Sequence, residues 1–210
     1  GGNNNMSIQG FTEEDFKVFT IDGLDQRMDA IKTIIRPKFE TLSQIFTDEL
    51  SVLTKSPIYP HIAKHARRTI NPPNDTWISF SSNPRGYKMQ PHFQIGLWET
   101  HVFIWFAVIY EAKGKDEIGK RLSEQTESIK NLIPSDYVWS VDHMKPDIIP
   151  HNSLSIESLS TMFDRLQTVK KAELLCGYKI PREEAIKLSG EQLVDVIRDV
   201  FVHLIPLYNV

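Results

Sequence analysis

The chain has 210 residues, 40% of them hydrophobic, and a formal net charge of −3 at pH 7. This length can bury one sizeable core but is short for two, so we expect a single domain over residues 6–210. The single cysteine, Cys176, excludes an internal disulfide, and the mild acidity gives no overall signature of nucleic-acid binding. With no membrane-spanning run and no signal-peptide pattern, we expect a soluble cytoplasmic protein with no membrane partner. Residues 1–5 contain nothing to bury and are interpreted as an expression remnant or a disordered start.

Apolar residues recur every three or four positions in several segments, which is the spacing of amphipathic helices. Thr12 precedes three acidic residues and is expected to cap a short helix. Pro37 interrupts the longest stripe, from Met28 to Leu53, so this helix should be bent or divided there. Further helices are predicted over residues 116–132 and 155–168, and a last one from the capping box Ser189-Gly190-Glu191-Gln192 to Pro206.

Segments rich in β-branched and aromatic residues indicate strands. The segment from His101 to Tyr110 is apolar on both faces, so it should lie in the interior of a sheet that is covered on both sides. In the segment before it, positions 93, 95 and 97 are apolar and share one face, whereas positions 92, 94, 96 and 98 are of mixed type and share the other. This alternation predicts one core face and one mixed face. We therefore expect an α+β fold, with helices from the N-terminal, middle and C-terminal parts wrapping a mainly antiparallel sheet of about five strands. These strands are predicted at residues 76–80, 93–98, 101–110, 137–142 and 172–180.

Positive charge is concentrated between His61 and Lys88. Five lysines and arginines face only Asp75 in this stretch, a local charge of +4, so the rest of the chain carries −7. His61, Lys64, His65 and Arg68 are spaced at i, i+3, i+4 and i+7, which predicts one face of a short helix that opens at Pro60. Its other face, from Ile62 to Ile70, should pack against the core, and its basic face should open near the second predicted strand.

These basic groups suggest an anion site, because a phosphate or carboxylate needs several converging donors. The neighbouring cations should also lower the pKa of His61 and His65. We expect an anionic small molecule to be the partner, without assigning a catalytic residue or a cofactor. The predicted ligand-binding residues are His61, Lys64, His65, Arg68, Arg85, Lys88, His92 and Gln94.

Two alternatives remain open for the same residues. The cations are interleaved with Trp77, Tyr87 and Trp98, which would suit an RNA-binding module, and a protein-interaction module is a related alternative. The cluster would instead be structural if its arginines anchor the proline-rich loop Asn71–Asp75. These readings differ in what a double change of Arg68 and Arg85 to alanine should do to anion binding and to stability.

Metal and thiol chemistry are not predicted. His61 and His65 have the i, i+4 spacing of a histidine pair, but the helix lacks the glutamate of the zinc-protease motif and Lys64 would oppose a cation. A second set, His92, His101, Asp142 and His143, could meet only through folding. Cys176 lies in an apolar strand and is expected to be a buried, inert thiol.

Several strings in the chain resemble those of a known family. They are Pro60–Arg68, Asn71–Pro73, Asp75–Trp77, Arg85–Lys88, Pro91–Gly96, Asp142–Pro146 and Val169–Lys171. On these, the chain from Phe11 to Tyr208 is similar to the YktB-like family of uncharacterised bacterial proteins. The resemblance implies an α+β protein with a sheet like that of biotin ligases and class II aminoacyl-tRNA synthetases. It implies no residue roles, because fold likeness does not assign a function.

Overall fold

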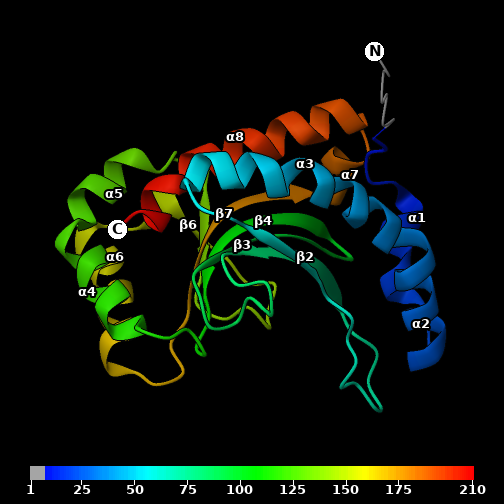
Figure 1. Ribbon diagram of the computed structural model, residues 1–210, viewed down its shortest axis with the longest axis horizontal. Helices are drawn as coiled ribbons and strands as arrows, with labels where there is room; N and C mark the ends of the chain where they lie inside the picture. The colour runs from blue at the N-terminus through cyan, green and yellow to red at the C-terminus, as the bar shows by residue number, and fades with distance from the viewer. Residues whose placement is uncertain (1–7) are drawn as a thin grey trace.

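The computed structural model describes residues 8–210. The prediction for residues 1–5 lies outside this range. Helical elements come from all parts of the described chain (Figure 1). They are α1 (Glu13–Lys17), η1 (Val18–Thr20), α2 (Leu24–Ala30), η2 (Ile31–Ile35), α3 (Arg36–Thr54), α4 (Lys115–Glu124), α5 (Thr126–Leu132), η3 (His151–Ser153), α6 (Ile156–Thr168), α7 (Arg182–Ala185) and α8 (Gly190–Tyr208).

Within residues 8–210, one sheet of seven strands has the order β1-β2-β3-β4-β7-β5-β6, and every neighbouring pair is antiparallel. This confirms the α+β fold and places β4 in the interior, as predicted. The strand number differs from five because β1 and β6, the two edges, have only four and two residues, too few for an alternation to be recognised. The strands are β1 (Tyr59–Ile62), β2 (Asp75–Ser81), β3 (His92–Trp98), β4 (His101–Val108), β5 (Val138–Ser140), β6 (Ile149–Pro150) and β7 (Leu174–Pro181).

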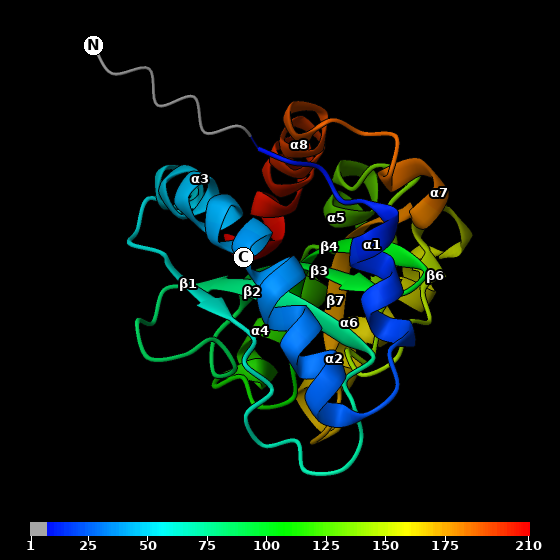
Figure 2. The same ribbon diagram turned by 90° about the vertical axis from the view of Figure 1, so that its right-hand side faces the viewer.

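Helices α3 and α8 lie across one face of the sheet, whereas loops lie below the central strands on the other (Figure 1). Figure 2 shows the same two helices above the strands from the side. Phe93 on β3 contacts Phe106 on β4 and Phe201 on α8, with ring centroids 5.8 and 5.3 Å apart. These edge-on aromatic contacts belong to the large apolar core between the sheet and its helices.

Apart from the helix expected at Pro60, the predicted helix starts are found, but the helix expected over residues 116–132 is divided into α4 and α5. Thr12 and Asp15 form a capping box at α1, and Ser189 and Gln192 form another at α8. At Pro37 the chain stays helical, because the wider π-turn η2 comes directly before it and makes room where a proline would otherwise break the helix. Pro206 does not end α8, which continues to Tyr208.

The predicted basic helix is wrong. Residues 59–62 form edge strand β1, which pairs with β2, and an irregular loop follows from 63 to 74. Pro60 fits an edge strand, where a missing N–H can face away from the ladder. His65 has a φ of 53°, and Ile70 is 80% exposed instead of packing on the core. Backbone pairing to β2 therefore overrides the helical spacing of the side chains.

Candidate functional site

A pocket of about 250 Å³ lies on the face of the sheet that α3 and α8 leave open. We call it the sheet pocket. Its floor contains Trp77 of β2, Trp98 of β3, and Phe103 and Trp105 of β4, and it is walled by the loops after β2 and after β5. Its polar side chains are Asp75, Tyr87, Lys88, Gln94, His101, Tyr110, Glu111, Ser140, His143 and Lys145.

Strand alternation builds this floor. Gly96 lies opposite Phe103 across the β3–β4 ladder, and a Cβ atom at Gly96 would come within 2.1 Å of the Phe103 ring. The ring can therefore cross β3 only because residue 96 has no side chain. The aromatic residues of this face belong to a second, smaller apolar cluster, separate from the helix-covered core.

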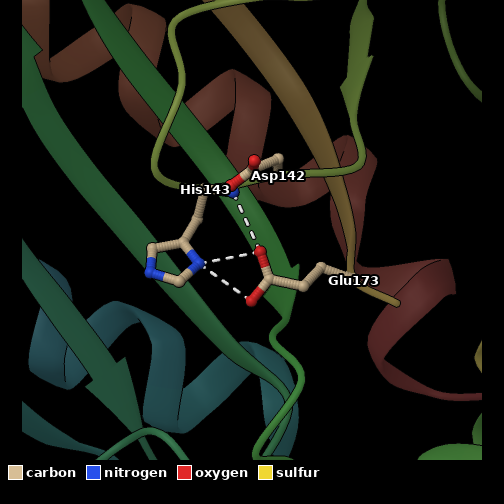
Figure 3. A group of neighbouring side chains, drawn as sticks. All are labelled: Asp142, His143 and Glu173. Carbon is tan, nitrogen blue, oxygen red and sulfur yellow. Dashed lines mark hydrogen bonds and ion pairs between the residues drawn. The ribbon is translucent and has the colours of Figure 1, made fainter. Parts of the chain in front are cut away.

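His143, in the loop after β5, is bound by the carboxylate of Glu173 just before β7. Its Nδ1 lies 2.7 and 2.8 Å from the two carboxylate oxygens, and its backbone N–H donates to Oε1 at 2.9 Å (Figure 3). A carboxylate can only accept these bonds, so Nδ1 carries the proton. In the neutral ring, Nε2 is then the nitrogen without a proton. The ring is held by one nitrogen and lines the sheet pocket.

Glu173 is itself fixed from several directions. The backbone N–H of Tyr110 donates to Oε2 at 3.0 Å, and the side chain is only 4% exposed. The turn that precedes it is held by Lys115, whose ammonium group donates to the carbonyls of Val169, Lys170 and Ala172 at 2.7 to 3.0 Å. A buried carboxylate with this many donors has little freedom to move.

The two partners shift each other's pKa in opposite directions. Burial alone would lower the pKa of His143, but the hydrogen bond and charge of Glu173, with the charges of Asp75 and Asp142, raise it above its ordinary value. Burial alone would raise the pKa of Glu173, but the hydrogen bonds from His143 and Tyr110 and the charge of His143 lower it. The ionised carboxylate therefore favours the protonated form of the ring, and the ring favours the ionised form of the carboxylate.

Asp75 at the start of β2 is the second titratable group of interest in the sheet pocket. Burial raises its pKa to about 7, and the charges of His143 and Arg68 only partly oppose this. A carboxyl group with such a pKa is present in both protonation states near neutral pH. It can therefore donate a hydrogen bond as an acid or accept one as a carboxylate.

Gln94 on β3 lines the sheet pocket, and the orientation of its side-chain amide is fixed by His92. His92 donates through Nδ1 to the carbonyl of Gln90 at 2.9 Å, which leaves Nε2 to accept from the Gln94 amide at 2.8 Å. Burial lowers the pKa of His92 to about 4, so the ring is neutral and this direction is fixed. The amide oxygen of Gln94 is thereby left to accept a hydrogen bond in the pocket.

Comparison with known sequences places the chain in a family. The family model described as "Domain of unknown function (DUF1054)" matches residues 11–208. The chain belongs to the DUF1054 family. Similar proteins include a UPF0637 protein of Bacillus cytotoxicus, 52% identical over 98% of this chain and 99% of the relative. A UPF0637 protein of Bacillus velezensis is 48% identical over 97% of both chains, and one of Bacillus mycoides is 52% identical over 97% of this chain and 98% of the relative.

Membership of the DUF1054 family confirms the resemblance noted from the sequence strings. The match covers nearly the whole described chain but assigns no residue a role, so the site has to be argued from its geometry. Within residues 8–210, no helix is both long and apolar enough to cross a bilayer.

The predicted ligand-binding residues do not meet at one place. Only Lys88 and Gln94 of the eight line the sheet pocket. His61 donates to the carbonyl of Asn83 at 2.8 Å, and His65 contacts the Thr76 hydroxyl at 3.1 Å. Burial first, and then the charges of Arg68 and Arg36, lower the pKa of His65 to about 4, as predicted in direction.

The remaining cations of the set are on the surface. Lys64 and Arg68 are exposed on the loop between β1 and β2, and Arg85 is exposed on the loop between β2 and β3. Arg68 makes a 3.4 Å contact with the carbonyl of Asn71 in its own loop. Once the helix is replaced by a strand and a loop, the spacing that aligned these groups has no structural meaning.

Asp142, His143 and Glu173 approach each other closely enough to share a metal ion, with one ligand atom from each within 4.8 Å of the others. However, the ligand atoms of these residues do not suit a metal ion, because they are already engaged in hydrogen bonds. Glu173 already accepts from two backbone N–H groups and from Nδ1 of His143, and Asp142 accepts from the backbone N–H of Met144 at 2.9 Å. We therefore interpret these residues as a hydrogen-bonded network and not as metal ligands.

The sequence reasoning missed the roles of Glu173 and Asp75. Asp75 shares a strand face with Trp77, as the alternation along β2 would have shown. Glu173 gives no local signal, because its partner is 30 positions away and the two meet only when β7 pairs with β4 and β5. Cys176 is fully buried, as predicted, and burial raises its thiol pKa.

Proposed function

We propose that this protein binds a small molecule with a planar apolar part and an anionic group, and that the sheet pocket is its site. The observation that supports this proposal most strongly is that two cations, Lys88 and Lys145, and the imidazole of His143 line a pocket whose floor is aromatic. An aromatic floor binds a planar group through its faces, and a few placed polar groups orient it. Gln94 adds an acceptor, and Asp75 adds a donor when it is protonated.

The size of the sheet pocket favours a small ligand. Small-molecule sites are typically roughly 300–1,000 Å³, so a volume of about 250 Å³ suits a compound with a single ring. Glu111 is exposed, lines the same pocket and carries the opposing charge, and Asp75 opposes the cations when ionised. The charge balance therefore favours an anion with one ionised group over a polyphosphate.

RNA binding by the basic residues is the alternative function. Its cations would be Lys64, Arg67 and Arg68 on the loop between β1 and β2, which are exposed. This loop projects beyond the strands, below β2 in Figure 1. A polyanion held there would be released steeply by salt, whereas a ligand inside a pocket responds less.

Intrinsic fluorescence provides the test, because Trp77, Trp98 and Trp105 line the sheet pocket. We expect benzoate and phenyl phosphate to change this fluorescence saturably. Changing both Lys88 and Lys145 to methionine should weaken binding by about tenfold or more, the scale of one lost hydrogen bond to a charged group. Changing Lys64 and Arg67 to methionine is the matched control and should leave binding unchanged.

Two results would contradict this proposal. One is the absence of any saturable response to either aromatic anion. The other is a loss of binding in the Lys64 and Arg67 variant with none in the Lys88 and Lys145 variant. Salt-sensitive binding of oligouridylate, lost in that same loop variant, would favour RNA instead.

A further inference from the structure

We propose that His143 is a general acid–base that exchanges a proton with the ligand in the sheet pocket, and that Glu173 is its positioning residue. This inference rests on the proposed binding function and adds chemistry to it. The geometry that carries it is a ring anchored by one nitrogen, with the other nitrogen directed away from the anchor.

The first step concerns the free nitrogen. Nδ1 of His143 is committed to Glu173, and no hydrogen-bond partner for Nε2 is found among residues 8–210. Figure 3 shows this second nitrogen pointing away from the carboxylate. The side chain is 28% exposed and lines the sheet pocket. A bound ligand can therefore reach Nε2 without breaking any contact that holds the ring.

The second step concerns how firmly the ring is held. Glu173 binds both the ring and the backbone N–H of His143, so loop and side chain are fixed by one group. Glu173 is in turn held by Tyr110 N–H, and Lys115 ties down the turn before it. An imidazole that is oriented by a buried carboxylate is the arrangement by which general bases keep one tautomer and stabilise the imidazolium they form.

The proton transfer is balanced without any further reagent. The lone pair of Nε2 takes a proton from an O–H or N–H group of the ligand, so a new N–H bond forms as the ligand bond breaks. The ring gains one positive charge beside the Glu173 carboxylate, and the ligand gains one negative charge near Lys88 and Lys145. The reverse transfer returns the proton. Asp75, on another wall of the pocket, can donate or accept a second proton.

Several charged or titratable groups surround this ring. Glu173 and Asp142 flank it, Asp75 and His92 approach from β2 and β3, and Tyr110, Glu111, Lys88 and Lys145 stand around the same pocket. The carboxylates outweigh burial and raise the pKa of His143. These carboxylates favour the charged ring that forms when His143 takes up a proton.

The test uses 4-nitrophenol, a planar ring with one ionisable O–H whose phenolate has its own visible absorption band. Fluorescence quenching reports binding, and the visible band reports whether the bound O–H has lost its proton. We expect the bound probe to be ionised at a pH where the free probe is mostly neutral. In the His143→Asn variant, whose amide can still donate to Glu173, the probe should bind but show a ratio of ionised to neutral form about tenfold lower, equivalent to one pKa unit.

The Glu173→Gln variant tests the positioning role, because it removes the negative charge with little change in shape. The ionised fraction of bound probe should fall here too, while a purely structural glutamate would affect only unfolding. His203 provides the matched control. Its Nδ1 lies 2.8 Å from a backbone carbonyl and 3.6 Å from Asp199, outside the sheet pocket, so His203→Asn should change nothing.

The outcomes separate the two proposals. Binding of 4-nitrophenol with unchanged ionisation in His143→Asn would overturn the acid–base role and leave the binding function standing. Failure of the wild-type protein to bind the probe, with benzoate and phenyl phosphate also failing, would overturn both. His143 is on a partly exposed loop, so its variant should fold, and thermal unfolding of each variant checks this.

Discussion

The two faces of strand β4 differ in what covers them and in the kinds of side chain around them. Val102, Ile104 and Phe106 point into the large core beneath the helices, whereas Phe103 and Trp105 point to the open face. The helix-covered side of the sheet is almost wholly apolar. The open side has an aromatic floor, but its walls carry Asp75, His143 and other titratable groups.

This difference has a physical cause. A face closed by helices excludes water, and a polar group there would need a partner or would cost free energy. A face closed only by loops leaves space that ligand or water can fill, and loops can present polar side chains at its edge. The largest stability effects should therefore come from the helix-covered face, and the largest binding effects from the open face.

The largest expected effect uses two phenylalanines of β4, one on each face. Phe106→Ala should lower the free energy of unfolding by about 3–5 kcal/mol, because it leaves a cavity among Phe93, Tyr208 and other closed-in side chains. Phe103→Ala should cost less, about 3 kcal/mol or below, because the space it leaves joins the sheet pocket. Urea denaturation of both variants measures the difference.

The loss of ligand affinity should be larger for Phe103→Ala than for Phe106→Ala, the reverse of the order expected for the loss of stability. Phe103→Ala removes part of the pocket floor and should weaken binding of benzoate, while Phe106→Ala should leave binding intact at temperatures where it is folded. Equal stability losses together with equal binding would show that the two faces are not distinct.

An intermediate effect is expected from Asp75→Asn, and it should depend on pH. Because burial raises the pKa of Asp75 from 3.8 to about 7, the folded state binds a proton that the unfolded state releases between these values. Stability therefore falls as pH rises through this window. Asparagine removes the penalty, so the variant should gain roughly 1–3 kcal/mol over wild type at pH 8 and little at pH 4.

Denaturation at several pH values measures this gain. The matched control is Asp147→Asn, an exposed aspartate, whose stability difference from wild type should show no such rise with pH. A gain for Asp75→Asn that was constant from pH 4 to pH 8 would mean that Asp75 is not held as a buried acid.

The sequence predicted the parts of the fold that depend on local patterns. The capping residues Thr12 and Ser189 and the doubly apolar β4 could be recognised because each signal lies within a few residues. The segment from His61 to Arg68 could not, because its helical spacing competes with backbone pairing to β2, which lies farther along the chain. Tertiary pairing commonly overrides such a local preference.

The candidate site was less predictable than the fold. Gln94 and Lys88 were identified from alternation and charge, and both line the sheet pocket. The His143–Glu173 pair depends on the crossover that brings β7 between β4 and β5, and no spacing in the sequence encodes that contact. The charge pattern identified a surface loop, whereas the candidate site is formed where elements distant in the sequence meet.

The smallest effect is expected from changing Arg68 and Arg85 together to alanine. Both arginines are exposed, and exposed charges contribute little to stability because water solvates and screens them. We expect the double variant to lie within about 1 kcal/mol of wild type, and to bind benzoate with unchanged affinity, because neither residue lines the sheet pocket. A loss of several kcal/mol would show that the arginines anchor the proline-rich loop through bonds to buried acceptors. A loss of anion binding without a loss of stability would instead move the binding site from the open face of the sheet to its loops.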